Sequence, residues 1–164
     1  MQTAIKIFLS TLLGVCVQSG NAQDGAYAQA MAARDQGQFA VARQLLEPLA
    51  QQGDAASQFQ LSLLYANGKG GPVNVMQSLR WLRLSAHAGY AAAQSNLGAA
   101  YSRGQLVPQD YVRAVAWFSL AVANGNPAAA TNRAVALSHM TAQQKLQAQE
   151  LAAMCLQGNL SACD

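Results

Sequence analysis

Two histidines are the side chains best suited to acid–base or metal chemistry in this sequence, but their positions favour neither. His87 and His139 lie far apart, and neither has an Asp or Glu at the spacing of a metal site. His87 falls in the polar end of an expected helix, where we interpret it as solvated. His139 stands where another helix should end, and a polar or cationic residue there caps the last turn. The histidines therefore predict no metal site.

Other residue patterns that perform catalysis are missing from the sequence. It contains no Gly-x-Ser-x-Gly, Ser-x-x-Lys or P-loop motif, and its seven acidic residues are too widely spread for a pair of catalytic carboxylates. The glycines of residues 68–71 belong to a repeated loop rather than to a phosphate site. We therefore expect no catalytic residue, no cofactor and no enzyme; a β-lactamase-like hydrolase is the alternative.

The composition points to helices. Of 164 residues, 34 are Ala and 20 are Gln, only 10% are charged, and four are Pro. Ala, Gln and Leu favour helix, and the low charge with abundant apolar residues argues against disorder. The formal charge of +3, on scattered basic residues, is too small for a nucleic-acid-binding surface.

Residues 1–22 have the layout of a secretory signal peptide. Lys6 precedes an apolar run, residues 7–17, that is too short to span a bilayer. Gly20 and Ala22 place small residues at −3 and −1 of a cleavage site. We expect a periplasmic or secreted protein with no transmembrane anchor after cleavage. An acylated Cys16 is an alternative, which the bulky residue before it disfavours.

A repeat of 36 residues organises most of the remaining chain. Gly53, Gly89 and Gly125 stand 36 residues apart. Superimposing residues 53–88 on 89–124 without a gap gives ten identities, which is hard to obtain from composition alone. The identities are Gly53/Gly89, Ala55/Ala91, Ala56/Ala92, Gln58/Gln94, Leu61/Leu97, Tyr65/Tyr101, Gly68/Gly104, Pro72/Pro108, Trp81/Trp117 and Leu84/Leu120.

Each repeat predicts two helices joined by a loop. The first helix places a Leu and a Tyr four residues apart in one apolar stripe, and it stops at Gly68 or Gly104 before a loop that contains Pro. The second helix carries Trp81 or Trp117, which we interpret as core residues that fill the gap between the two helices. One such pair cannot bury its own faces, so the pairs must stack.

The flanking segments are variants of the same unit. Residues 26–53 predict two helices with a tight turn, and residues 126–158 predict a terminal capping unit followed by a short tail, residues 159–164. Asn126 and Pro127 suggest a helix start. Thr141 and Gln144 form a capping box for the last long helix.

The repeat resembles the Sel1-like repeat, a relative of the tetratricopeptide repeat. The shared pattern is A-x-Q-x-x-L-x-x-x-Y-x-x-G, a loop with Pro, a Trp and a closing A-x-G; residues 90–125 are the better match. In the earlier repeat, Ser62 and Asn74 replace the residues seen at Gly98 and Asp110. The resemblance covers residues 26–158 and implies an all-α fold, a right-handed α-α superhelix of about four helical hairpins that binds other proteins.

Two cysteines remain after the signal segment. In the repeat register Cys155 corresponds to Val122 and Cys163 to Ala130, which face each other across the turn between repeats. Cysteine-rich secreted Sel1-like proteins resemble this C-x7-C spacing, and the resemblance implies a disulfide, the usual state of a Cys pair in an exported protein. A zinc site, which lacks further ligands here, or two buried thiols are the alternatives.

Binding residues are expected on the concave side of the superhelix, which the first helix of each repeat usually lines. Phe59 and Leu63 form either a small exposed apolar patch or a contact between repeats. The full set of concave candidates is Phe59, Leu63, Ala66, Ser95, Ala99 and Ser102.

These features together predict an exported adaptor that holds a protein or peptide partner in the bacterial cell envelope. Two alternatives stay open. One is an envelope enzyme or binder acting on β-lactams or peptidoglycan, as suggested for some cysteine-rich relatives. The other is a structural component of a secretion or polysaccharide-export assembly. The identity of the partner and the oligomeric state are not encoded in any recognisable motif.

Overall fold

The computed structural model describes residues 23–163. The expected signal segment, with Lys6, Cys16 and Ala22, lies outside the described residues. Within residues 23–163 no helix is long and apolar enough to cross a membrane.

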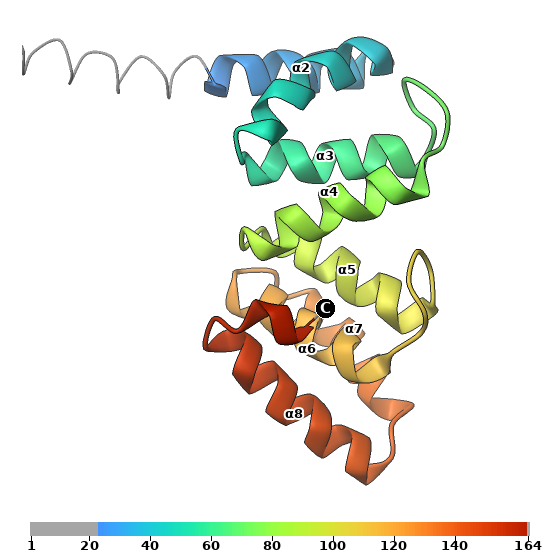
Figure 1. Cartoon of the computed structure of the whole chain (residues 1–164), viewed down its shortest axis with the longest axis vertical. Helices are drawn as coiled ribbons and strands as arrows, with labels where there is room; N and C mark the ends of the chain where they lie inside the picture. Colours follow the sequence, from blue (N-terminus) through green and yellow to red (C-terminus); the bar gives the residue numbers. More distant parts are fainter. Residues whose placement is uncertain (1–22, 164) are drawn as a thin grey trace, which may run out of the picture.

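The described chain is all-helical, as predicted, and forms four hairpins that stack in chain order (Figure 1). Each hairpin packs against the next, and no strand occurs between residues 23 and 163. The helices are residues 23–35, α2 (Phe39–Gln51), α3 (Ala55–Ala66), α4 (Val75–His87), α5 (Ala91–Arg103), α6 (Tyr111–Ala123), α7 (Ala129–Ser138), α8 (Ala142–Leu156) and the short 3-10 helix η1 (Leu160–Cys163).

Side-chain caps define where several helices begin. Asp54, Asn74 and Asp110 each accept a hydrogen bond from the backbone N–H three residues later, which satisfies a donor that the helix itself leaves unpaired. The capping box of Thr141 and Gln144 is present at the start of α8, as predicted.

The predicted start of α7 is wrong by two residues. A turn precedes the helix at this point, and the carbonyl of Asn126 accepts a hydrogen bond from the backbone N–H of Ala129. Residue 128, rather than 126, is the N-cap, and it makes no side-chain capping hydrogen bond.

The repeated glutamines connect each hairpin to the one before it. Gln58 Nε2 donates to the carbonyl oxygen of Ala50 at the end of α2, and Gln94 Nε2 donates to that of Ala86 at the end of α4, both at 3.0 Å. Both side chains are buried. Each amide therefore satisfies a carbonyl in the last turn of the preceding helix, which explains a glutamine at this position in both repeats.

Both tryptophans are buried, but they belong to two separate apolar clusters. Trp81 packs with Leu46, Leu61 and the helix of residues 23–35, which we call the N-terminal cluster. Trp117 packs with residues of α5, α6, α7 and α8, which we call the C-terminal cluster.

The leucines at the repeated position 84/120 differ from each other. Leu120 is 5% exposed within the C-terminal cluster, whereas Leu84 is 42% exposed. The reason is that α8 packs against α6, while α4 packs mainly against α3 and α5.

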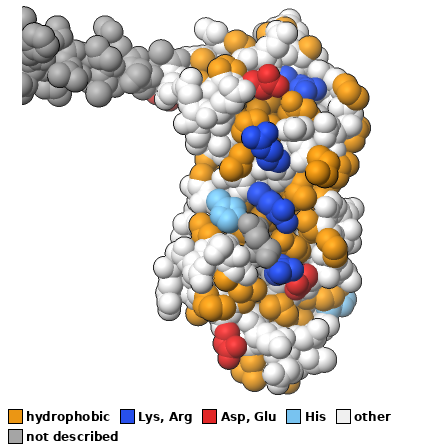
Figure 2. Space-filling view, in the orientation of Figure 1, with side chains coloured by type: hydrophobic (Ala, Val, Ile, Leu, Met, Phe, Trp, Pro, Cys, Tyr) orange, Lys and Arg blue, Asp and Glu red, His pale blue; other side chains and the backbone are white. Residues whose placement is uncertain are grey.

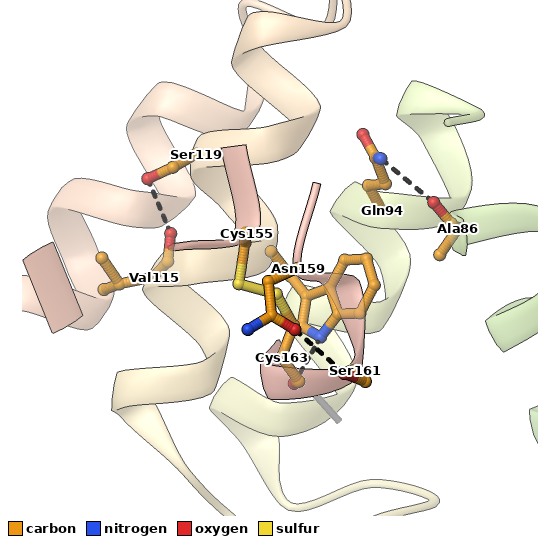
Figure 3. The surroundings of a disulfide bond; sticks show 9 residues. Ala86, Gln94, Val115, Ser119, Cys155, Asn159, Ser161 and Cys163 are labelled. Atoms are coloured by element: carbon orange, nitrogen blue, oxygen red, sulfur yellow. Dashed lines mark hydrogen bonds between the residues drawn. A yellow bond between two sulfur atoms is a disulfide. The ribbon is translucent and has the colours of Figure 1, made fainter. Parts of the chain in front are cut away.

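A disulfide joins Cys155 in α8 to Cys163 in η1, which confirms the predicted pair (Figure 3). The carbonyl oxygen of Cys163 accepts a hydrogen bond from Trp117 Nε1 at 3.0 Å. Both cysteines and the indole are buried. The end of the described chain is therefore fixed to the core by one covalent bond and one buried hydrogen bond.

The loop between α3 and α4 contacts the first hairpin. Arg43 Nη1 donates to the carbonyl oxygen of Gly70, and Lys69 lies 4.7 Å from the centre of the Phe39 ring. Gly70 has φ +78°, and a Cβ there would lie 2.5 Å from the carbonyl oxygen of Phe39. Only glycine fits this close approach.

Candidate interaction groove

Two neighbouring hollows follow α3, α5 and α7, the first helices of three successive hairpins. The first, of about 470 Å³, lies between α3, α4 and α5; the second, of about 390 Å³, lies between α5, α6 and α7. Ala99 and Arg103 of α5 line both. We call the combined surface the A-helix groove.

Four of the six predicted concave residues line the A-helix groove. Leu63 and Ala66 contribute from α3, and Ala99 and Ser102 contribute from α5. Ser95 is half-buried and lines neither hollow. The side chains of α3 and α5 thus contribute to one surface, as the repeat pattern suggests.

The repeated leucines of α3 and α5 face the core rather than the groove. Leu61 and Leu97 have no exposed surface, and neither lines either hollow. Leu61 packs in the N-terminal cluster, whereas Leu97 packs in the C-terminal cluster together with Tyr101, four residues later. Leu97 therefore offers no surface to a partner, and its place in the repeat pattern reflects the stacking of the hairpins alone.

Of the two alternatives left open for Phe59, the structure shows the contact between repeats, so Phe59 is not a groove residue. Phe59 is only 9% exposed, and its ring lies 5.3 Å from that of Tyr90, the residue that precedes α5. Leu63 is half-buried and also packs against the C-terminal cluster. Phe59 therefore connects two repeats rather than offering an apolar side chain to a partner.

Carboxamides supply much of the polar lining of the groove. Asn96 and Asn132 are exposed and occupy the same repeat position in α5 and α7. Gln60 holds this position in α3, but its Oε1 accepts a hydrogen bond from Arg34 Nη1 at 3.0 Å. Gln60 also interacts with Tyr27, whose pKa is raised above its usual value mainly because burial disfavours the phenolate.

One arginine provides the permanent charge of the A-helix groove. Arg103, at the end of α5, is exposed and lines both hollows, and neither hollow is lined by an Asp or Glu. Arg103 and the two asparagines were missed by the prediction from sequence. The shared register of Asn96 and Asn132 follows from the 36-residue period, but the sequence does not show that these two side chains and Arg103 are exposed.

The two histidines occupy different surroundings. His139 caps α7, as predicted, lines the second hollow and stacks on the ring of Tyr111 at 5.2 Å. His87 is half-buried with its ring 5.5 Å from that of Trp117, so its interpretation as a solvated side chain is wrong. No group of three or more potential metal ligands lies together within residues 23–163.

Comparison with protein families identifies the repeating unit. The family model of the Sel1 repeat matches residues 55–90 and 91–126. The chain contains two Sel1 repeats. Proteins built from Sel1 repeats are generally scaffolds for protein–protein interaction, and the fold is typically non-catalytic. The first Sel1 repeat comprises α3 and α4, and the second comprises α5 and α6.

Solved structures show the same architecture. One is c5321, a protective antigen present in uropathogenic Escherichia coli strains, which displays an SLR fold; it is 28% identical over 86% of this chain, with a TM-score of 0.78. The chain covers only 31% of c5321. A Sel1 repeat protein from Oxalobacter formigenes is 28% identical, with 64% of this chain and 95% of that chain covered and a TM-score of 0.53. No curated protein matches the chain.

A strained residue of the second Sel1 repeat lines the groove. Leu106 has φ +69°, is 38% exposed and borders the first hollow. The equivalent residue of the first Sel1 repeat is Gly70, with φ +78°. A left-handed conformation costs a leucine about 1–2 kcal/mol, a cost that glycine avoids. Such a residue is informative when it borders a candidate site, because selection for stability alone would favour glycine there.

Proposed function

We propose that this Sel1-repeat protein is an exported scaffold of the bacterial cell envelope that holds a segment of a partner protein in the A-helix groove. The observation that carries the proposal is Leu106. It keeps an apolar side chain at the border of the groove despite a backbone conformation that favours glycine. A partner that contacts this side chain would account for its presence.

The lining of the groove suits an extended peptide that carries an acidic group. Asn96 and Asn132 can each donate to and accept from peptide backbone groups, because a carboxamide has both kinds of hydrogen-bonding atom. Arg103 would pair with a carboxylate of the partner, and no acidic lining residue competes with it. Leu63 and Leu106 would contact apolar side chains.

Capture of partners from envelope extracts tests the groove. We expect the immobilised chain to retain a protein that Leu106→Gly and Arg103→Glu variants lose. Leu106→Gly is informative because relief of the strain offsets the lost apolar contacts, so the free energy of unfolding should change by no more than about 1 kcal/mol. Leu156→Gln, at an exposed position of α8 outside the groove, is the matched control. Equal capture by all variants, or hydrolysis of a β-lactam reporter by the chain, would contradict the proposal.

Export is supported by the N-terminal sequence and by the disulfide. Lys6 and the apolar run of residues 7–17 have signal-peptide character, and stable disulfides belong to oxidising compartments. When the full chain is produced in a Gram-negative host, we expect the soluble periplasmic protein to begin at Gln23. An N-terminal sequence that begins at residue 1, or at an acylated Cys16, would contradict export as a cleaved soluble protein.

A further inference from the structure

The two hollows of the A-helix groove are built from the same repeat positions. Seven of the nine residues that line the second hollow stand 36 residues after a residue that lines the first. The polar pairs among them include Asn96/Asn132, Asn67/Arg103 and Arg103/His139. The groove is therefore periodic, with one step for each hairpin, and a partner segment that fills it must match that step.

One position of the groove changes from neutral to basic along the stack. Asn67, Arg103 and His139 hold this position at the C-terminal ends of α3, α5 and α7, and we call them the groove ladder. Asn67 offers an uncharged amide, and its Nδ2 already donates to the carbonyl oxygen of Leu63 at 2.8 Å. Arg103 offers a charged donor, and His139 has a ring N–H donor in either protonation state. Carboxylates therefore find better partners at the second and third steps than at the first.

The donors of Arg103 and His139 are available to a partner. Within residues 23–163 neither side chain forms an ion pair or a side-chain hydrogen bond, although the ring of His139 stacks on that of Tyr111. Elsewhere basic residues pair with acids: Arg34 with the neighbouring Asp35, and Arg113 with Asp110. Figure 2 shows acidic side chains beside Lys and Arg side chains on the viewed face. No Asp or Glu lines either hollow of the groove.

The step of the groove matches the geometry of a polyproline II segment. Packed helices lie about 8–10 Å apart, and α5 contacts α7. In polyproline II every third side chain returns to the same face after about 9 Å. In a β-strand the second side chain returns after about 7 Å, and an α-helix needs about seven residues to advance 10 Å. Positions i and i+3 of a polyproline II segment therefore reach successive steps of the groove.

We propose that the A-helix groove binds a polyproline II segment of the partner that carries acidic side chains at positions i and i+3. One carboxylate faces Arg103 and the other faces His139, while a neutral side chain faces Asn67. Polyproline II leaves the backbone without internal hydrogen bonds, so its free polar groups bond to Asn96 and Asn132. This inference rests on the proposed function, because it specifies which segments the same groove selects.

Synthetic peptides test the spacing with the purified full chain. Two proline-rich peptides have the same composition, one with Glu at i and i+3 and the other with Glu at i and i+2. By fluorescence anisotropy we expect the i, i+3 peptide to bind about fivefold more tightly, the gain from one additional exposed ionic contact. Equal affinity, or no binding of the i, i+3 peptide, would overturn the proposal. Tighter binding of an alanine-rich helical peptide with Glu at i and i+7 would also overturn it.

Substitutions in the groove ladder locate the two carboxylates. Arg103→Gln and His139→Gln should each weaken binding of the i, i+3 peptide by about fivefold. Each should also remove the preference over the i, i+2 peptide, because the preference requires both contacts at once. If either variant keeps the wild-type affinity and preference, the assignment of that residue is wrong.

A gain of binding tests the shared step directly. Asn67→Arg should let the chain bind a peptide with a third Glu, at i−3, about fivefold more tightly than the wild type does. The substituted residue is the exposed C-cap of α3, where a basic side chain also suits the helix dipole. Gln157→Arg, at the exposed C-cap of α8 outside both hollows, is the matched control and should give no gain. Equal affinities of the Asn67→Arg variant and the wild type would overturn the proposed periodicity.

These results separate the acidic pattern from the proposed function. If Arg103→Glu loses a captured envelope protein but the wild type shows no preference among the peptides, the groove is a partner site and the acidic pattern is wrong. If the peptides bind with the expected preference but no envelope protein is captured, the pattern stands and the envelope scaffold is wrong.

Discussion

In the second Sel1 repeat, Gly98 allows the ring of Phe118 to lie directly against α5. A Cβ at position 98 would come within 2.9 Å of two ring atoms of Phe118 and within 3.2 Å of the carbonyl oxygen of Ala114. The first Sel1 repeat has different residues at these two positions. There Ser62 donates its hydroxyl hydrogen to the carbonyl oxygen of Phe59, and Leu82 replaces the larger phenylalanine.

We expect Gly98→Ala to lower the free energy of unfolding by about 1–2 kcal/mol. The alanine gains up to about 1 kcal/mol in helix propensity, but forcing an extra methyl group into a filled core costs about 1–3 kcal/mol. Denaturation in urea measures the difference. Phe118→Leu alone should also destabilise, because it leaves a cavity.

The double variant decides whether Gly98 and Phe118 interact as described. In the Gly98→Ala background, Phe118→Leu should cost less than it does in the wild type, because the shorter side chain accommodates the new methyl group. Additive effects of the two substitutions would argue against the close contact. The repeat superposition shows that Gly98 replaces Ser62 and that Phe118 replaces Leu82, but it does not show that Gly98 and Phe118 are in contact.

At the scale of elements, α8 and η1 form a closed unit with the indole of Trp117. The disulfide restricts a short loop, and the hydrogen bond from Trp117 Nε1 to Cys163 orients η1 against α6. The disulfide was predicted from the register of the repeat, the expected export and the resemblance to cysteine-rich Sel1-like proteins, with a zinc site or two buried thiols as the alternatives. The hydrogen bond was not predictable, because it depends on how η1 turns back onto α6.

Removing the disulfide should weaken the whole C-terminal cluster. A Cys155→Ala/Cys163→Ala variant should lose about 2–3 kcal/mol, the stabilisation expected for closing a loop of this length. Thermal unfolding with and without a reductant measures it. The reductant should lower the Tm of the wild type and leave the Tm of the double variant unchanged; a reductant-insensitive wild type would contradict a stabilising disulfide.

The helices were predictable as elements, and their ends were predictable where a cap is encoded. The capping box of Thr141 and Gln144 was predicted, whereas the caps at Asp54, Asn74 and Asp110 were found in the structure, although their residue types are those that favour a cap. The start of α7 was mispredicted because a turn, rather than a side-chain cap, precedes the helix at Asn126. A side-chain capping hydrogen bond depends on residues close together in the sequence. Whether the chain at Asn126 forms a separate turn or the first turn of the helix depends on packing.

At the scale of the whole molecule, the two apolar clusters should differ in stability. The N-terminal cluster around Trp81 is smaller and contains no disulfide, whereas the C-terminal cluster around Trp117 includes the Cys155–Cys163 bond. In stacked repeats each unit contacts only its neighbours, so stability varies along the stack.

Single-tryptophan variants test this difference. Trp117→Phe leaves Trp81 as the only tryptophan, and Trp81→Phe leaves Trp117. We expect the fluorescence of Trp81 to report unfolding at a lower urea concentration than that of Trp117. Circular dichroism of each variant controls for the effect of the substitution on total helix content. Coincident fluorescence and circular-dichroism transitions in both variants would show that the stack unfolds as one unit.

The sequence predicts the stack, the helices that line the groove and four of the side chains that reach it, but not Arg103, Asn96 and Asn132. Phe59 and Ser95, which share one register, were predicted to line the groove but do not: the ring of Phe59 packs against that of Tyr90 and is buried. Leu106 aligns with Gly70, so the departure from glycine is visible in the repeat superposition. The surroundings of Leu106 cannot be inferred in this way, because the space next to each of the two residues depends on the neighbouring hairpin. The exposure of Leu84 on α4 likewise depends on packing, because α8 packs against α6 rather than α4.

The contact between Gly70 and Phe39 bears on the pitch of the superhelix. The backbone of the α3–α4 loop approaches that of the first hairpin with no side chain between them, and Arg43 Nη1 donates a hydrogen bond to the carbonyl oxygen of Gly70. This close contact restricts how the first two hairpins can move relative to each other. The loop of the second Sel1 repeat has Leu106 at that point, and this side chain borders the first hollow. We therefore expect a bound partner to change the angle between hairpins around the groove more easily than the angle between the first two hairpins.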